Sequence, residues 1–339
     1  MNGFGSMLKD YLEFYKISQK DFAERLNISY KHMNEIINDE TNISEELMLA
    51  ISLITDIDVN LIFYVENKKR VYKYLIDKYK NEKEVNKYLN SYSLKEMEEK
   101  KWIVLKDDVS VAQKALDLLD FLKISNFDNI DNYIDKKILY KKKDNSDITK
   151  TYLWIKRCDE ICNRQNVLEY SKDKYNDLLE VLKIERTKKF NKDRLIKIFN
   201  EHGIYLVIED ALKGTKVRGC TSVKVKNPAI YLTTYLKEKS SFYFTLYHEL
   251  AHVKTDYNKA KNVILINDGD MDKESKADIY ALNQMIDEKI YKSILENRNK
   301  EKEICKLNHI PLCFLYSRLA YEKIIKYNSK EYLSYREII

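Results

Sequence analysis

The sequence predicts a mainly α N-terminal half, made of a helix-turn-helix module and a helical linker, followed by an α+β domain with a small sheet. Three observations predict this fold class. Apolar residues recur at helical spacing in the first half, as in the run from Val111 to Leu122. Short β-rich runs follow after residue 200, and a helical pattern comes after them. With only 6 Gly and 2 Pro in 339 residues, a turn-rich β-sandwich is not expected.

These patterns divide the chain into four parts. We assign the helix-turn-helix domain to residues 1–66 and the helical linker region to residues 67–147. The α+β domain is expected over residues 148–290, and residues 291–339 are expected to form its C-terminal helical extension. The polar stretch from Lys141 to Asp147 is the candidate linker, because it follows a lysine-rich helical pattern and lacks apolar periodicity.

Residues 8–65 carry the pattern of successive short helices. Ser18 is placed to cap one helix, with an acidic residue three positions later, as in a capping box. After a three-residue turn, Ser29 can cap a helix over residues 30–38, and Ser44 begins a further helix that ends near residue 55. A short helix, a tight turn and a second short helix is the helix-turn-helix geometry.

The stretch from Ile17 to Ser29 resembles the XRE (Cro/repressor-like) family, and the segment from Ile43 to Tyr64 is similar to its antitoxin-type branch. The resemblance implies that the helix after the turn enters the major groove of double-stranded DNA. The residues that would face DNA are Gln19, Ser29, Tyr30, Lys31 and Asn34. Residues 1–70 hold eight basic and twelve acidic residues, a net charge of −4, whereas phosphate neutralisation supplies most non-specific affinity for DNA. A fold kept for dimerisation or protein contact, including a homodimer, is therefore a second interpretation.

Composition limits the classes of location and partner. The net charge of the whole chain is +6, so the part after residue 70 carries +10. The first residues lack a basic segment followed by an apolar core, and no uncharged apolar run approaches the roughly 20 residues of a membrane helix. We therefore expect a cytoplasmic protein with no membrane partner. The five Cys are irregularly spaced, so we interpret them as packing residues and not as a paired-Cys zinc site.

The second half changes from helical to mixed patterning. Residues 204–208, 217–225 and 229–233 are β-rich runs. A helix opened by Ser240-Ser241 follows, and a further helix is predicted over about residues 273–287. A small sheet beside one long helix is an α+β arrangement.

The segment from His248 to His252 has the residue types and spacing of a zinc site. Two His four apart on a helix lie on one face, so both can bind one zinc ion at about 2.0–2.1 Å. Glu249, beside the first His, can take the proton of a water that zinc has acidified as that water attacks a peptide carbonyl. Two solvated His on a surface helix are the alternative, which the scarcity of His (5 in the chain) disfavours.

A catalytic zinc needs a third protein ligand and one open position. The metzincin option requires Gly and His at offsets where this chain has Thr255 and Asn258, so that option fails. The acids in range are Asp268, Asp270, Asp272 and Glu274. Glu274 is favoured because it begins an apolar-periodic helix and can point back at the first helix. Asp278, one turn later, could accept the other ring N–H of a ligating His.

The segments FYFTLYHELAHV, from Phe242 to Val253, and ESKADIYA, from Glu274 to Ala281, together resemble the ImmA/IrrE family of metallo-endopeptidases. The similarity covers about residues 148–339. It implies a zincin-like domain with an HExxH active-site helix, which holds Zn²⁺ through its two His and a Glu ligand and uses a Glu base. Those roles fall on His248, His252, Glu274 and Glu249. Ala251 stands where the family usually has Gly, a departure that concerns packing.

Two functions follow from these features. The leading one is an intracellular zinc endopeptidase that makes limited cuts in a regulatory protein, expected to be a helix-turn-helix repressor. The alternative is a DNA-binding transcription regulator or antitoxin-like protein whose zincin domain senses a metal, peptide or partner without proteolysis. Self-cleavage near residues 141–147 is a third option. The candidates for stabilising the oxyanion of the reaction are Arg218, Tyr257, Tyr280 and His309.

Overall fold

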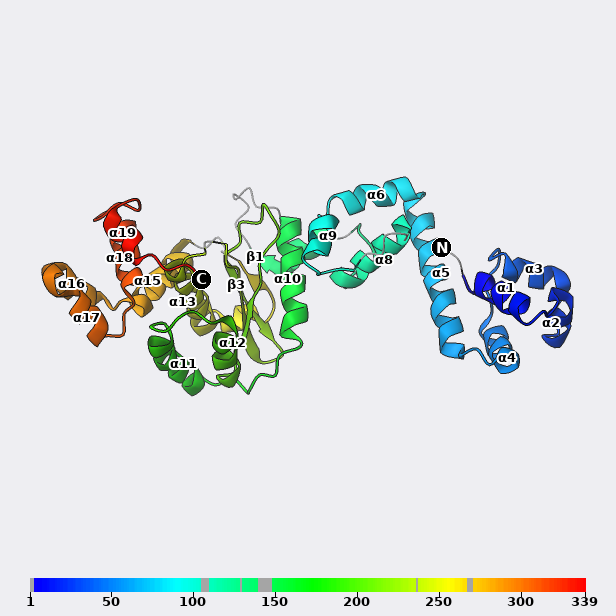
Figure 1. Cartoon of the computed structure of the whole chain (residues 1–339), viewed down its shortest axis with the longest axis horizontal. Helices are drawn as coiled ribbons and strands as arrows, with labels where there is room; N and C mark the ends of the chain where they lie inside the picture. The colour runs from blue at the N-terminus through cyan, green and yellow to red at the C-terminus, as the bar shows by residue number, and fades with distance from the viewer. Residues whose placement is uncertain (1–2, 105–109, 129, 140–147, 236, 267–270) are drawn as a thin grey trace. The chain divides into compact units, whose positions relative to one another are not determined.

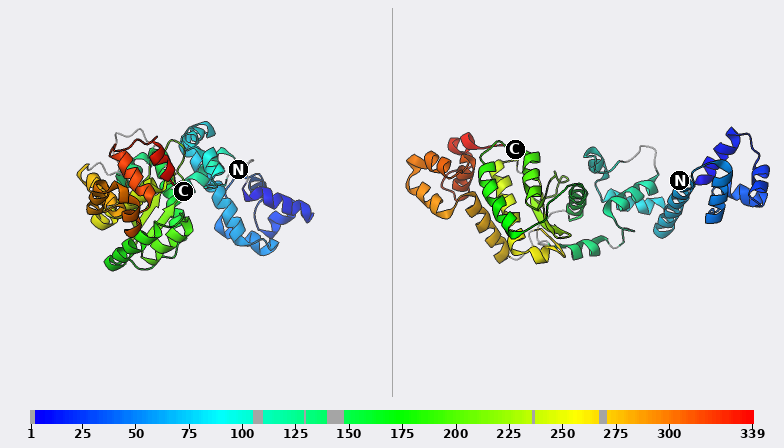
Figure 2. Two further views of the ribbon diagram at one scale, coloured as in Figure 1. Left: turned by 60° about the vertical axis from the view of Figure 1, so that its left-hand side comes forward. Right: turned by 90° about the horizontal axis from the view of Figure 1, so that it is seen from below.

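The computed structural model divides the chain into two compact units, residues 1–127 and 128–339 (Figures 1 and 2). The residues it describes are 3–104, 110–128, 130–139, 148–235, 237–266 and 271–339. The predicted linker from Lys141 to Asp147 lies outside the described residues, as do Asp268 and Asp270.

The first unit is helical throughout the part that the structure describes. Its helices are α1 (Phe4–Phe14), α2 (Gln19–Arg25), α3 (Tyr30–Ile37), α4 (Glu45–Thr55), α5 (Val59–Tyr79), α6 (Glu82–Asn90), α7 (Leu94–Glu99) and α8 (Val111–Leu122). The predicted caps form: the hydroxyls of Ser18, Ser29 and Ser44 each accept a hydrogen bond from the backbone N–H three residues later, at 3.1–3.2 Å. Each cap satisfies an N–H group that a helix start otherwise leaves unpaired.

The start of α1 is held by two carboxylates, one in the turn after α3 and one on α5. Asp39 accepts hydrogen bonds from the backbone N–H groups of Gly3 and Gly5, at 2.8 and 3.1 Å. Glu66, on α5 and fully buried, accepts one from Phe4 at 3.0 Å. The predicted domain boundary at residue 66 therefore falls inside α5. The buried carboxylate of Glu66 connects this helix to the first turn of α1 through the hydrogen bond from Phe4.

The second unit contains a five-stranded mixed sheet with the strand order β1-β5-β3-β4-β2. The strands are β1 (Ile138–Leu139), β2 (Tyr205–Ile208), β3 (Gly219–Lys224), β4 (Asn227–Leu232) and β5 (Ile264–Leu265). The helices are α9 (Ile130–Lys137), α10 (Ile148–Cys162), α11 (Lys172–Glu185), α12 (Lys192–Glu201), α13 (Lys239–Thr255), α14 (Tyr257–Ala260), α15 (Met271–Met285), α16 (Glu288–Glu296), α17 (Glu301–Leu307), α18 (Leu312–Tyr321) and α19 (Lys330–Tyr335), with a 3₁₀ turn η1 (Arg298–Lys300).

The sheet lies between α13 and α10 (Figure 1). Neighbouring residues of β4 point to opposite faces. Ile230 and Leu232 join the apolar cluster that contains α13, whereas Tyr231 packs edge-on against Trp154 of α10. Both faces are covered, which explains why β4 is apolar along its length and does not alternate with polar residues.

The boundaries predicted at residues 147 and 290 also differ from the structure. β1 comes from the predicted linker region and pairs in parallel with β5, so the sheet begins before residue 148. Helices α16–α19 share one apolar cluster with α13, and the rings of Phe314 and Tyr243 lie 5.4 Å apart. The second unit is therefore continuous from Asp128 to Ile339.

The structure bears on two expectations from composition, one about the Cys residues and one about membrane helices. All five Cys are buried and free, in agreement with their interpretation as packing residues. None of the described helices combines the length and the apolar character that crossing a membrane requires.

Candidate metal centre

Helices α13 and α15 pack against each other and run in opposite directions. Asp256, just after α13, pairs with Lys273 near the start of α15, with 2.9 Å between Oδ1 and Nζ. Earlier on α13, His248 contacts Asp278, which lies later on α15. Glu274 lies between these two pairs. The antiparallel packing therefore places the turn with both His against the turn that carries Glu274.

Three ligand-type groups converge between the two helices. The Nε2 atoms of His248 and His252 are 3.2 Å apart. The carboxylate of Glu274 lies 3.3 Å from the Nε2 of His248 and 3.7 Å from that of His252. The ligand atoms all lie within 4.8 Å of one another, so the group could hold one metal ion. Of the two acids in range that the structure describes, Asp272 and Glu274, it is Glu274 that joins this group.

These separations fit a tetrahedral zinc ion. Metal–ligand bonds of about 2.0–2.1 Å in tetrahedral geometry place neighbouring ligand atoms about 3.3 Å apart. The separation of the two Nε2 atoms, 3.2 Å, and that between Oε2 of Glu274 and Nε2 of His248, 3.3 Å, match this value. The 3.7 Å contact with Nε2 of His252 is made by the other oxygen of Glu274, Oε1. Three protein ligands leave a fourth position open for water or substrate.

Each imidazole is held from behind by a carboxylate. The Nδ1 of His248 lies 2.8 Å from Asp278, the partner that the sequence predicts. The Nδ1 of His252 lies 3.2 Å from Asp256, which we did not single out in the sequence. An ionised carboxylate can only accept, so Nδ1 of each ring donates to its carboxylate, which leaves Nε2 as the ring atom that can bind a metal in place of a proton.

Charge at this site favours a cation. Two Nε2 lone pairs and a carboxylate face one another at short range, which a bound cation or an added proton relieves. Burial by itself lowers the pKa of His248, but hydrogen bonds to Asp278 and Glu274, with the charges of Glu249 and Glu274, outweigh it and raise the pKa to about 10. Burial disfavours the ionised form of Asp256, yet hydrogen bonds from Lys273, Thr255 and His252 hold its pKa at about 2.

Glu249 is a buried carboxylate directed toward the sheet and not a member of the ligand group. The hydroxyl of Thr221 on β3 donates to its Oε2 at 2.6 Å. A Cβ at Gly219 would lie 2.8 Å from its Oε1, so only glycine leaves room for the carboxylate there. Burial raises the pKa of Glu249, while the two His and the Thr221 hydrogen bond act in the opposite direction. A carboxylate with a raised pKa is a better proton acceptor.

Four residues are sequence candidates for stabilising an oxyanion. The hydroxyl of Tyr257 donates to the carbonyl of Lys226, and that of Tyr280 lies 2.9 Å from the Tyr175 hydroxyl. His309 is exposed in the turn between α17 and α18. Arg218 is exposed directly before Gly219, and none of the described residues forms an ion pair or hydrogen bond with its guanidinium group. Arg218 is thus the candidate with an uncommitted donor beside the site.

The residues predicted to face DNA lie on α2 and α3 of the first unit. Ser29, Tyr30, Lys31 and Asn34 are exposed, and Gln19 is partly exposed. The hydroxyl of Ser29 serves as the helix cap, and the ammonium of Lys31 lies 3.9 Å from Glu35. The surface is accessible, but its cation has an acidic neighbour.

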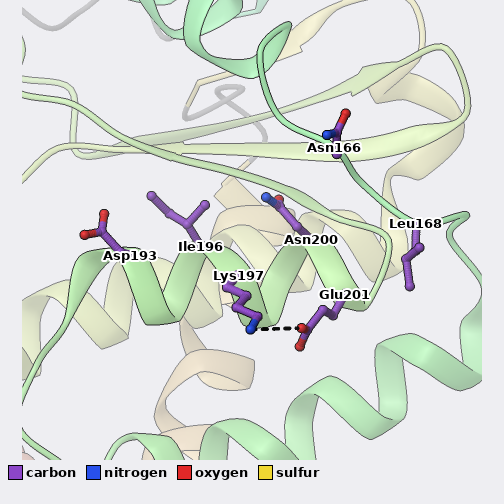
Figure 3. A pocket seen from close by; sticks show the side chains of 7 residues that line it. All are labelled: Asn166, Leu168, Asp193, Ile196, Lys197, Asn200 and Glu201. Carbon is purple, nitrogen blue, oxygen red and sulfur yellow. Dashed lines mark ion pairs between the residues drawn. The ribbon is translucent and has the colours of Figure 1, made fainter.

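A separate hollow of about 450 Å³ lies along α12 (Figure 3). Its lining residues are Asn166, Leu168, Asp193, Ile196, Lys197, Asn200 and Glu201. Lys197 pairs with Glu201 at 3.9 Å, as the dashed line in Figure 3 shows. The lining includes neither His nor Cys, so we assign it no chemistry.

Comparisons with known proteins add no evidence about this site. No protein-family model, no curated protein and no solved structure matches the chain.

Proposed function

We propose that this chain is a zinc-dependent endopeptidase that makes limited cuts in a regulatory protein. The observation that carries the proposal is the convergence of His248, His252 and Glu274 at distances that one metal ion could bridge, with the buried carboxylate of Glu249 one residue from the first of them. A zinc ion held there would polarise a peptide carbonyl and acidify a water molecule. The resemblance to ImmA/IrrE metallo-endopeptidases and the zincin-like order of sheet and helices support the same reaction class.

The residues around the proposed zinc ion have different roles. Asp278 and Asp256 orient the two imidazoles, so that the ligand geometry exists before a substrate binds. Glu249 accepts the proton of the attacking water and can return it to the leaving amine. Thr221 fixes one carboxylate oxygen of Glu249. The site therefore combines three ligands with a positioned base.

The experiment measures zinc content and cleavage together. We expect one zinc per chain, and cleavage of the helix-turn-helix repressor encoded beside its gene. Glu249→Gln should bind zinc as the parent does and cleave about 10²- to 10⁴-fold more slowly, because it lacks the general base.

Glu296→Gln, an exposed change on α16, is the matched control and should cleave normally. Cleavage that persists unchanged in Glu249→Gln would contradict the assigned role. Zinc at far less than one per chain would contradict the metal centre.

A second candidate function is DNA binding by the first unit, with the second unit sensing a metal, peptide or partner. The exposed positions of Tyr30, Lys31 and Asn34 on a short helix after a tight turn favour it. The resemblance to the XRE family implies that this face enters the major groove. A mobility-shift assay with the chain's own upstream DNA tests this candidate.

In that assay, Asn34→Ala should weaken specific binding by about 1–3 kcal/mol, as expected for the loss of one base contact. Lys95→Ala on α7 is a control that changes charge away from this face. Equal binding to the upstream fragment and to unrelated DNA, at low and high salt, would count against sequence recognition.

A further inference from the structure

A cavity of about 330 Å³ lies in the second unit along the groove between α13 and α15. Its walls include Phe244 of α13, Leu282 and Met285 of α15, and Phe314 of α18. A volume near the lower end of the range for ligand pockets, about 300–1,000 Å³, suits one large side chain better than a long segment.

The cavity begins one helical turn from the metal centre. On α13, Phe244 precedes His248 by four residues, and the two rings lie 6.4 Å apart. On α15, which runs the opposite way, Leu282 follows Asp278 by four residues. Four residues of helix span about 6 Å, whereas one residue of an extended peptide spans about 3.3 Å. A peptide whose carbonyl sits at the metal therefore reaches the cavity with a side chain one or two residues away.

The polar groups of the cavity do not oppose an apolar occupant. The guanidinium of Arg318 also lines it, but that group already donates to Glu288, Glu322 and the carbonyl of Ile286. The second guanidinium, on Arg218, is exposed and uncommitted among the described residues. The remaining polar lining consists of hydroxyls, those of Ser240 and Ser317, which are hydrogen-bonded to each other, and those of Ser241, Tyr321 and Tyr327. Apolar walls with a few polar groups are the usual composition of a ligand site.

We infer that this cavity selects substrates with a large apolar side chain, of the size of Leu, Met or Phe, beside the scissile bond. The inference rests on the proposed function, because the peptide is positioned by the zinc. The side chain lies against Phe244, Leu282 and Met285, and Arg218 donates to a peptide carbonyl of the same substrate.

Hydroxamic acids test this preference without cleavage. The zinc-loaded full-length chain is titrated by calorimetry with N-acetyl amino acid hydroxamates and with 2-substituted succinyl hydroxamates, which present a side chain on opposite sides of the metal-binding group. In one of the two series, the isobutyl or benzyl compound should bind about 10- to 100-fold more tightly than the unsubstituted one, because burial removes an apolar side chain from water.

Leu282→Trp should fill the cavity, so that the substituted compound binds no more tightly than the unsubstituted one. Ile279→Trp, on the exposed face of the same helix, should keep the gain, and the unfolding midpoints of both variants show whether they fold. Equal affinities across both series, or a gain that survives Leu282→Trp, would overturn the inference and leave the proposed function intact. Failure of every hydroxamate to bind the zinc-loaded chain would overturn both.

Discussion

The two imidazoles of the candidate metal centre contact carboxylates that differ in burial. Asp278 is about half exposed, whereas Asp256 is buried and also binds Lys273 and Thr255. A buried partner with its own hydrogen bonds moves less, so it holds its ring in place more firmly. We therefore expect His252 to be the better oriented of the two His ligands.

Asp256→Ala should weaken zinc binding by about 10- to 100-fold, because the His252 ring loses the acceptor that fixes its orientation. Competition with a chromophoric chelator measures the dissociation constant. Asp272→Ala, an exposed change on the first turn of α15, should leave the affinity close to that of the parent. Unchanged affinity in Asp256→Ala would show that the contact with His252 does not support the ligand.

At this scale the sequence predicted which three residues come together but not all of their surroundings. His248, His252 and Glu274 follow from helical periodicity and the ligand requirement of zinc. Asp256 also stands four residues after His252, a spacing that signals contact on a helix, but it lies at the helix end, where periodicity no longer indicates direction. Thr221 approaches Glu249 from a strand 28 residues earlier, which no local pattern reveals.

Among the elements, the contact between β3 and α13 determines where Glu249 lies. Thr221 and Gly219 are two residues apart on β3, so they present the same face to the helix. One donates to the carboxylate and the other leaves space for it. The strand thus positions the base as directly as the helix that carries it.

Gly219→Ala should displace the carboxylate, because the new methyl group would lie 2.8 Å from Oε1 of Glu249 and 2.9 Å from Leu232. We expect the free energy of unfolding to fall by about 1–3 kcal/mol, as for other overpacked sites. Cleavage should fall as well, while zinc still binds. Ser222→Ala, on the opposite face of the strand, is the matched control in urea unfolding. A Gly219→Ala protein with the parent's stability and cleavage rate would contradict this packing.

The sequence predicted long elements well and short ones poorly. The Ser-capped helices of the first unit and the three strands after residue 200 carry caps or apolar runs that indicate them. β1 and β5 are two residues each, Ile138-Leu139 and Ile264-Leu265, too short for any periodicity. They form because each pairs with a strand that is distant in the sequence, β5 with β3 and β1 with β5. α5 crosses the predicted boundary at residue 66, and its buried Glu66 accepts a hydrogen bond from α1, a contact between distant segments that no local pattern reveals.

In the whole molecule, the three residues of the candidate metal centre all belong to the second unit. The first unit has an apolar cluster of its own, formed by α1–α5, and the ligand helices belong to a different cluster. Units with separate cores can unfold separately. Zinc should therefore stabilise one unit and not the other.

Calorimetry of the zinc-loaded chain should show two transitions, and a chelator should lower only one of them. A ligand present at 100 times its dissociation constant stabilises the folded state by about 2.7 kcal/mol, which its removal reverses. Phe22→Ala, in the core of the first unit, should lower the other transition. A single transition that shifts as a whole in both experiments would show that the units unfold together.

The central claim is that His248, His252 and Glu274 bind zinc while Glu249 does not. The most direct measurement is the zinc dissociation constant of Glu274→Gln compared with that of Glu249→Gln. We predict that Glu274→Gln loses more affinity than the roughly 10- to 100-fold that removing an outer partner costs, whereas Glu249→Gln binds zinc as the parent does. Parental affinity in Glu274→Gln, or loss of zinc in Glu249→Gln, would contradict the assignment.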